Sequence, residues 1–271
     1  MDDKIKSLIQ AYSCETPGEI KPKVVDLKVS KKKKSSSPTK PKKLLDKSLY
    51  KDLPPSLKTD LTLVFIGFNP GLQSSLTQHH YAHFSNLFWK LFNQSKLIYS
   101  VVDVETALEN DTFLQSRTTG QEVSKFTAVD DYDLLDYGIG FTDMVLRCTK
   151  AIDELTKAEK LENVPRLFDE LKAAKPKFLC FIGKGIWEVI VTYLNGFKNF
   201  KLKDFKWGVQ KVSEAEGEYR RLLLSLQKHL GYDDYGLYIF PNTSGLVTSL
   251  KFHEKLELWN NLVKDIYSRK T

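Results

Sequence analysis

Short, continuous apolar runs alternate along the chain with longer stretches in which apolar positions recur at helical spacing. The runs span residues 61–67, 178–183 and 236–241, and such runs are typical of strands that a parallel sheet buries on both faces. The stretches with helical spacing fall at residues 85–95, 155–174, 184–194, 217–230 and 252–268. This alternation predicts an α/β fold: a three-layer α/β/α sandwich around a central, mainly parallel sheet.

Residues 102–130 interrupt this alternation. They are polar, acidic and aperiodic, so neither a strand nor an amphipathic helix is predicted for them. We interpret them as an inserted, mobile loop between the first strand with its helix and the rest of the sheet.

The first 58 residues differ in composition from the rest of the chain. They carry 15 Lys and Arg against 7 Asp and Glu, a formal charge of +8, whereas residues 59–271 carry 26 against 27, a charge of −1. Apolar residues are too sparse here to offset the entropy of ordering. We therefore predict a disordered, Lys-rich arm over residues 1–58 and one globular domain over residues 59–271. The lysines suit a nuclear import signal, a tether to nucleic acid or a solubilising tail.

Several classes of protein are excluded by what the sequence lacks. No apolar run approaches the roughly 20 residues that span a bilayer, and the first residues lack the basic and apolar regions of a secretory signal. The cysteines, Cys14, Cys148 and Cys180, are odd in number and not spaced as C-x-x-C. This argues against a disulfide framework or a zinc or iron–sulfur site and favours a reducing compartment. Neither a P-loop nor a G-x-G-x-x-G motif occurs, which disfavours an unrelated nucleotide-binding α/β protein.

Small, polar and turn-forming residues follow each predicted strand. Residues 68–71 read Phe-Asn-Pro-Gly, residues 184–185 read Lys-Gly, and residues 242–246 read Asn-Thr-Ser-Gly-Leu. Because ligands of such sheets bind beyond the carboxyl ends of the strands, we expect these loops to form one active-site edge. Asn-Pro-Gly is also ordinary turn chemistry. The Asn69 amide is a poor base, but its carbonyl oxygen could position a water for attack on an oxocarbenium-like sugar.

The segment from residue 66 to residue 97 carries a more specific signal. It begins I-G-F-N-P-G-L, continues through the histidine-rich Q-H-H-Y-A-H, and contains N-L-F-W-K. It resembles the mismatch-specific uracil/thymine DNA glycosylases of the uracil-DNA glycosylase superfamily, whose signature is G-I-N-P-G-L, a histidine- or aromatic-rich loop, then N-x-F-W-K. Further similar blocks follow in the same order at residues 137–149, 183–188 and 240–246. The resemblance covers about residues 60 to 268, and it implies the superfamily fold and no metal or cofactor.

The resemblance implies two catalytic residues and a base pocket. Asn69 matches the asparagine that holds the attacking water, and Thr149 matches a threonine near that water. Tyr81 matches the aromatic residue that stacks on the extruded base, and Ser74 matches a small residue that leaves room for a thymine methyl group. His80 matches a position beside the base, although an exposed loop histidine is an equal alternative. The full pocket comprises Phe68, Gly71, Ser74, His80, Tyr81 and Asp143.

The resemblance also implies a DNA-binding surface. Leu246 corresponds to the wedge that fills the gap left by the flipped nucleotide, and Ser244 to a group that grips the neighbouring phosphate. A helix N-terminal role for Asn86 and an ordinary exposed lysine at Lys184 remain alternatives to DNA contact. The expected surface comprises Asn86, Lys184, Asn242, Thr243, Ser244, Gly245, Leu246 and Lys251.

This sequence departs from the family pattern at two informative places. No arginine follows Leu246, so contact with the unpaired guanine would fall to backbone groups or to Lys251. Asp143 stands where relatives have asparagine or lysine. Because a carboxylate only accepts hydrogen bonds, we expect Asp143 to favour bases with a ring N–H, such as uracil, thymine or hypoxanthine. The alternative is that Asp143 faces solvent.

The sequence as a whole predicts a monofunctional DNA glycosylase that removes uracil, and also thymine, from G·U and G·T mismatches in double-stranded DNA. We expect a nuclear monomer without a membrane partner, whose abasic product passes to downstream repair enzymes. One rival interpretation is a catalytically weak DNA-binding or scaffold protein that keeps the glycosylase fold. Another is a different superfamily branch: the cysteine count excludes the iron–sulfur branch, and Asn69 disfavours the branch that uses an aspartate.

Overall fold

The computed structural model describes residues 50–102, 110–118, 124–202, 205–245 and 250–270, all within one compact unit. Five strands form one sheet in the order β2-β1-β3-β5-β4. The first four in this order run parallel, and β4 pairs antiparallel with β5 at one edge. The strands are β1 Leu63–Gly67, β2 Ile139–Asp143, β3 Phe178–Ile182, β4 Gly208–Gln210 and β5 Gly236–Phe240.

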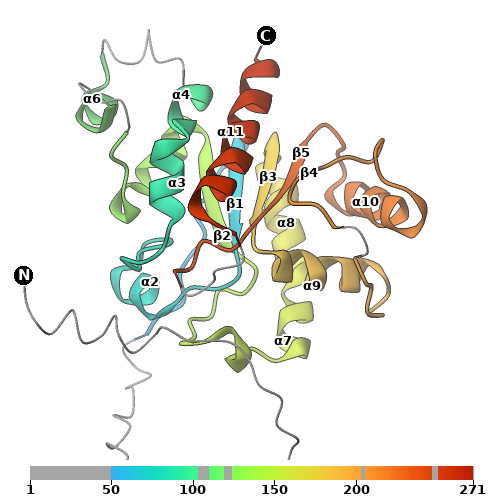
Figure 1. Cartoon of the computed structure of the whole chain (residues 1–271). Coiled ribbons are helices and arrows are strands. Elements are labelled where there is room, and N and C mark those ends of the chain that lie inside the picture. The colour runs from blue at the N-terminus through green and yellow to red at the C-terminus, as the bar shows by residue number, and fades with distance from the viewer. Residues whose placement is uncertain (1–49, 103–109, 119–123, 203–204, 246–249, 271) are drawn as a thin grey trace, which may run out of the picture. The chain divides into compact units, whose positions relative to one another are not determined.

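Helices cover both faces of the sheet (Figure 1). In β1, Leu63 and Phe65 pack in one apolar cluster and Val64 and Ile66 in the other, because successive side chains of a strand point to opposite faces. The cluster around Phe65 is closed by α3 (Phe88–Gln94), α4 (Leu97–Val101) and α11 (Phe252–Ser268), and the second cluster by α8 (Val164–Ala174), α9 (Lys184–Leu194) and α10 (Gly217–Leu230). This confirms the predicted three-layer α/β/α fold with a mainly parallel sheet.

Some elements differ from their predicted positions. Residues 155–174, expected to form one helix, contain two helices, α7 (Lys157–Glu162) and α8, which are separated by Asn163. Pro165 lies in the first turn of α8. The described part of the expected loop 102–130 contains α6 (Thr112–Thr118), and the segment's Leu114 and Phe126 are buried in the apolar cluster around Phe65. The interpretation of this segment as a mobile insertion is therefore wrong for its described residues, because few but large apolar side chains anchor it.

The segment before β1 also departs from the expected boundary at residue 58. Ser56 forms a two-way backbone bridge with Phe141 of β2, and Leu53 is 1% exposed. The described residues 50–58 thus belong to the globular domain and cover the outer edge of β2, which would otherwise expose unpaired backbone groups. The rest of the expected arm lies outside the described residues.

The carboxyl ends of the parallel strands gather at the side of the sheet where α2 and α9 begin (Figure 1). No helix in the described parts of the chain combines the length and apolarity needed to cross a membrane. The remaining short elements are α2 Leu72–Thr77, α6 Thr112–Thr118, η3 Ala128–Asp130, η4 Asp133–Tyr137, η5 Ile152–Glu154 and α7 Lys157–Glu162.

Candidate active site

A cleft of about 670 Å³ opens at the carboxyl edge of the sheet. Its walls come from the loops after β1, β2 and β5 and from the connection between α2 and α3. Segments far apart in sequence therefore meet at the edge where the parallel strands end, as the position of the loops predicts.

Backbone hydrogen bonds join the loop after β1 to the loop after β2 beyond the end of the sheet. The N–H groups of Met144, Val145 and Thr149 donate to the carbonyl oxygens of Gly67, Phe68 and Pro70 at 2.8, 2.9 and 3.2 Å. The side chain of Arg147 in the second loop is bound by both carboxylate oxygens of Glu159, at 2.6 and 3.0 Å. The two loops consequently form one fixed backbone frame.

Asn69 lies on this frame with its amide orientation determined. Its Nδ2 donates to Thr149 Oγ1 at 2.7 Å, to Arg147 O at 3.1 Å and to Pro70 O at 3.3 Å. Backbone carbonyls only accept hydrogen bonds, so the nitrogen must face them and Oδ1 must point the other way. Asn69 lines the cleft, and no donor among the described residues contacts its Oδ1. This oxygen can therefore accept a hydrogen bond from a water or ligand.

Asp143, at the end of β2, is buried in the floor of the cleft and is 6% exposed. Burial raises the pKa of its carboxyl group from 3.8 to about 6, against the opposing charges of His80 and Arg166. A Cβ at Gly67 would collide with Asp143 Oδ1 and lie 3.2 Å from the hydroxyl oxygen of Tyr81. Gly67 thus allows Asp143 and Tyr81 to converge over β1, and the alternative that Asp143 faces solvent is wrong.

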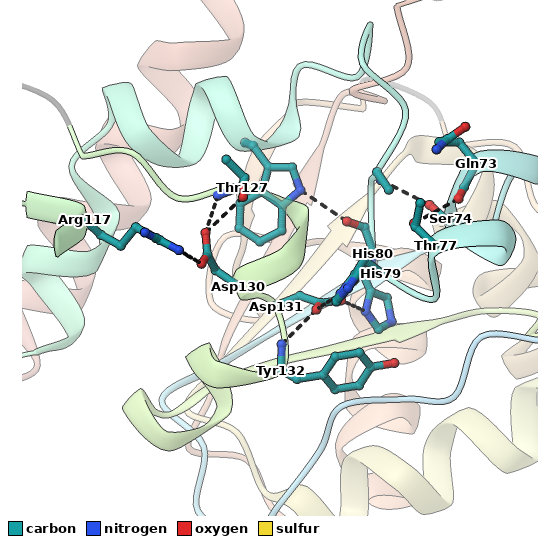
Figure 2. Close-up of polar contacts among 12 residues, drawn as sticks. Gln73, Ser74, Thr77, His79, His80, Arg117, Thr127, Asp130, Asp131 and Tyr132 are labelled. Atoms are coloured by element: carbon teal, nitrogen blue, oxygen red, sulfur yellow. Dashed lines mark hydrogen bonds and ion pairs between the residues drawn. The ribbon is translucent and has the colours of Figure 1, made fainter. Parts of the chain in front are cut away.

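A buried carboxylate, Asp131, fixes two neighbouring histidines (Figure 2). Its Oδ1 accepts from His79 Nδ1 at 2.7 Å, and its Oδ2 accepts from both Nδ1 and the backbone N–H of His80, at 2.8 and 2.7 Å. Burial raises the pKa of Asp131, but these hydrogen bonds more than compensate and lower it below its ordinary value. An ionised Asp131 requires the proton of His80 on Nδ1, which leaves Nε2 as the atom that can meet a ligand.

Two buried polar atoms beside the cleft lack a partner among the described residues. They are His80 Nε2 and the hydroxyl of Tyr81, and both side chains line the cleft together with Asp143. One face of the Tyr81 ring is covered by Phe88, whose ring is parallel at a centroid distance of 3.9 Å. Unpaired buried polar atoms are costly in a folded protein, so a set of them in one cleft indicates a polar ligand.

The remaining expected pocket residues lie at the same cleft. Ser74 is buried in α2, where its hydroxyl accepts from the backbone N–H of Ala82 at 3.2 Å. Gly71 is exposed at the N-terminus of α2, and Phe68 is half-buried against the α9 side of the sheet. All three residues line the cleft.

The opposite side of the cleft is formed by the loop after β5. Asn242 Oδ1 accepts from the backbone N–H of Ser244 at 2.8 Å, which shapes a tight turn. Thr243 is buried and accepts from the N–H of Leu87 at 2.8 Å. A Cβ at Gly245 would lie 2.6 Å from the carbonyl oxygen of Ser85. Residues 242–245 all line the cleft, and Leu246 lies outside the described residues.

Three expected DNA-contact residues are less directly placed. Asn86 lines the cleft, but its Oδ1 also accepts from Phe88 N–H at 3.0 Å, so the helix N-terminal role is present. Lys184 pairs with Glu188 at 3.3 Å and does not line the cleft. Lys251 precedes α11, where its N–H donates to Glu254, and it does not line the cleft either. Of Asn86, Lys184 and Lys251, the geometry therefore supports a direct role at the cleft only for Asn86.

The sequence interpretation missed two residues that hold the site. Asp131 occurs in a polar stretch where nothing distinguishes it from a solvent-exposed aspartate. Lys255 is 1% exposed, and its Nζ donates to Asn242 O at 2.8 Å. A lysine within an amphipathic helix is ordinarily assigned to the exposed face, so the one available signal is that Lys255 falls on the stripe shared with Trp259 and Leu262.

Comparison with known proteins identifies the family. A model described as "Uracil DNA glycosylase superfamily" matches residues 54–263. A protein of Schizosaccharomyces pombe named "G/U mismatch-specific uracil DNA glycosylase" is 28% identical over 241 residues, which is 89% of this chain. The chain spans 60% of the length of that relative. The match over most of the domain, with the Asn69 loop and the cleft at the expected edge of the sheet, establishes that this chain belongs to the uracil DNA glycosylase superfamily.

Proposed function

We propose that the protein is a monofunctional DNA glycosylase that removes uracil, and also thymine, from G·U and G·T mismatches in double-stranded DNA. The observation that carries this proposal is the fixed Asn69 amide, whose nitrogen is bound by Thr149 and the Arg147 carbonyl. This arrangement directs the side-chain oxygen of Asn69, Oδ1, away from the backbone frame that the loops after β1 and β2 form. The name of the Schizosaccharomyces pombe relative, which specifies G/U mismatches, supports the choice of a G·U substrate.

In this mechanism the extruded nucleotide enters the cleft with its base against the free face of Tyr81. The bond between C1′ and the base nitrogen breaks first, and its electron pair leaves with the base as an anion. Asn69 Oδ1 holds a water against the electron-poor C1′, and the water becomes the hydroxyl of the abasic sugar while its proton passes, directly or through solvent, to the base anion, which leaves as the neutral base. A weak acceptor such as an amide suffices, because the sugar cation forms before the water adds.

Three polar groups in the cleft, from Asp143, Tyr81 and His80, suit the hydrogen-bonding edge of a uracil. The Asp143 carboxylate accepts the ring N–H above its pKa of about 6, the Tyr81 hydroxyl donates to a carbonyl group of the base, and His80 Nε2 lies beside them as an acceptor. The small Ser74 side chain leaves room for the methyl group of thymine.

DNA binding would use the loop after β5. Ser244 and the backbone of residues 242–245 grip a phosphate next to the flipped nucleotide, and Leu246 enters the vacated position. Weaker pairing at a mismatch lowers the cost of extrusion, so mismatch preference follows without reading of flanking sequence. Residues 1–49 supply sequence-independent attraction to DNA and a nuclear address, and the abasic product passes to downstream repair enzymes.

A gel assay on four substrates tests this function. The wild-type protein is incubated with duplexes containing G·U, G·T or A·U and with single-stranded uracil DNA, and abasic sites are cleaved with alkali. We expect strong cleavage with G·U, weaker cleavage with G·T and the least with A·U. Cleavage of none of the four, together with retained duplex binding, would support the scaffold interpretation instead.

A further inference from the structure

Phe84 is the most exposed large apolar side chain in the described parts of the chain. Its exposed fraction is 94%, whereas the next highest values are 61% for Phe197 and 59% for Val129. Among the described residues, its ring contacts only that of the exposed neighbour His83, at a centroid distance of 4.6 Å. Exposure of an aromatic ring to water is unfavourable, and burial of the ring against a binding partner would lower the free energy.

The backbone around Phe84 forms a defined turn. His83 Nδ1 lies 2.9 Å from Ser85 Oγ and 3.3 Å from the backbone nitrogen of Ser85, and Asn86 N–H donates to the carbonyl oxygen of His83 at 2.8 Å. Phe84 occupies the tip of this closed turn. The ring is therefore presented by an ordered scaffold, and binding through it requires little ordering of the backbone.

This turn packs directly on the loop after β5. Gly245 approaches Ser85 so closely that a Cβ at Gly245 would lie 2.6 Å from the Ser85 carbonyl oxygen, and Leu87 N–H donates to Thr243 O. His83 and Ser85, on either side of Phe84, line the same cleft as Asn69. The exposed ring thus stands at the cleft mouth, next to the loop that the proposed function assigns to the DNA.

We propose that Phe84 is a second apolar wedge, which stacks against a base of duplex DNA beside the extruded nucleotide. This inference rests on the proposed function and adds a DNA-contacting residue from a different loop. Extrusion of a nucleotide opens the base steps beside it, and an apolar side chain can replace the stacking that is lost there. A flat ring at the mouth of the cleft lies where it can contact these steps.

A protein partner for this ring is the competing occupant. Duplex DNA is favoured because two further exposed apolar side chains, Leu76 and Ile152, line the same cleft. Exposed apolar side chains thus occur at the cleft itself, and the two neighbours of Phe84, His83 and Ser85, also line it.

The test compares Phe84→Ala, Phe84→Trp and the control Phe197→Ala. Phe197 is also exposed but follows α9 and does not line the cleft. Each protein is titrated into a G·U duplex whose uridine carries a 2′-fluorine, which blocks hydrolysis, with 2-aminopurine on one side of the uridine. We expect Phe84→Ala to bind about tenfold more weakly and to lose part of the 2-aminopurine fluorescence rise. Phe84→Trp and Phe197→Ala should behave as wild type.

Single-turnover release of uracil from the unfluorinated duplex and from single-stranded DNA completes the test. Phe84→Ala should be slow on the duplex and unchanged on the single strand, which has no stack to open. Equal affinity and fluorescence for Phe84→Ala and wild type would overturn the wedge, and would point to a protein partner. Failure of the wild type to release uracil would instead contradict the proposed function. In that case the 2-aminopurine fluorescence of Phe84→Ala and wild type would still show whether Phe84 inserts into the duplex.

Discussion

The two sides of the cleft are built in different ways. The reaction wall (residues 67–72, 79–81 and 143–149) fixes its polar side chains by hydrogen bonds, as Asn69 is fixed by Thr149 and His80 by Asp131. The duplex wall (residues 83–86 and 242–245) is fixed through its backbone, by the close approach of Gly245 to Ser85 and by a hydrogen bond between Leu87 and Thr243.

This difference matches the demands of the two proposed tasks. Chemistry on an extruded base requires a few atoms held at defined positions, because small displacements are costly in rate. Binding to duplex DNA requires side chains that remain free to meet the strand, so the protein fixes the backbone and leaves a ring such as Phe84 exposed. Variants in the two walls should therefore separate reaction rate from affinity.

The largest effect is expected for Asn69→Ala in the reaction wall. Removal of the amide removes the acceptor that holds the water, and single-turnover uracil release from a G·U duplex should fall by about 10³-fold. Affinity for the duplex, measured by fluorescence anisotropy, should stay within a factor of two of wild type. The reason is that Asn69 is uncharged, so its removal takes away no attraction to the phosphates. The exposed Asn199 provides the control variant Asn199→Ala, and a rate within tenfold of wild type for Asn69→Ala would contradict the role of Asn69.

Asp131→Ala should give the largest loss of stability. It leaves His79 Nδ1, the N–H and Nδ1 of His80 and the N–H of Tyr132 without their acceptor. We expect the free energy of unfolding to fall by about 3 kcal/mol, measured by urea denaturation. The exposed neighbour Asp133 gives the control Asp133→Ala, which should be neutral. An equally small effect for both variants would show that Asp131 does not hold the reaction wall.

Asp143→Asn should stabilise the protein at neutral pH and change its base preference. The raised pKa of about 6 means that the folded state holds a proton that the unfolded state releases near pH 4. Stability conferred by the protonated group is therefore lost as pH rises from about 4 to 6. Asn lacks this titration, so Asp143→Asn should be more stable by about 2 kcal/mol at pH 7 and similar to wild type near pH 4.

The same variant tests the choice of base, because an amide can donate as well as accept. We expect Asp143→Asn to gain relative activity on modified cytosines and to lose it on G·U. The control is Asp136→Asn, since Asp136 is exposed. Unchanged substrate preference and an unchanged slope of stability against pH would contradict the role of Asp143.

The smallest effect is expected for deletion of residues 1–49, which removes 13 Lys and Arg and 6 Asp and Glu. Duplex affinity at low salt should fall by about tenfold and depend less steeply on salt, because fewer counterions are released on binding. Uracil release at saturating enzyme should be unchanged. The deletion stops before Tyr50 because residues 50–58 pack on β2. A lower rate at saturation would show that the arm takes part in the reaction.

The parts of the fold that could be predicted are those encoded locally. Continuous apolar runs such as residues 178–183 fix buried strands, and the loops after them then meet at one sheet edge for topological reasons. The sequence pattern does not predict strand β2, because Ile-Gly-Phe-Thr-Asp is short and mixed, and this segment becomes a strand by pairing with β1. The segment 50–58 joins the domain for the same reason, through the pairing of Ser56 with Phe141.

The candidate site shows the same division. Asn69 and Thr149 could be named from motif resemblance, and the structure brings them to hydrogen-bond distance across 80 positions of sequence. Asp131 could not be named, because it acts through histidines that lie 51 and 52 positions away and it has no local signature. Lys255 is marked only by its place on the apolar stripe of α11. Their roles depend on burial, which follows from the tertiary packing of η3 and α11 and not from the residues around them.

The most direct test of the account is one side-by-side measurement of uracil release and duplex affinity. Single-turnover rates at saturating enzyme on a G·U duplex and on single-stranded uracil DNA, together with dissociation constants for the duplex, are determined for wild type, Asn69→Ala and Phe84→Ala. The account predicts that Asn69→Ala loses the rate and keeps the affinity, whereas Phe84→Ala loses affinity and releases uracil from single-stranded DNA at the wild-type rate. Loss of duplex affinity in Asn69→Ala, together with loss of the single-strand rate in Phe84→Ala, would contradict the separation of the reaction wall from the duplex wall.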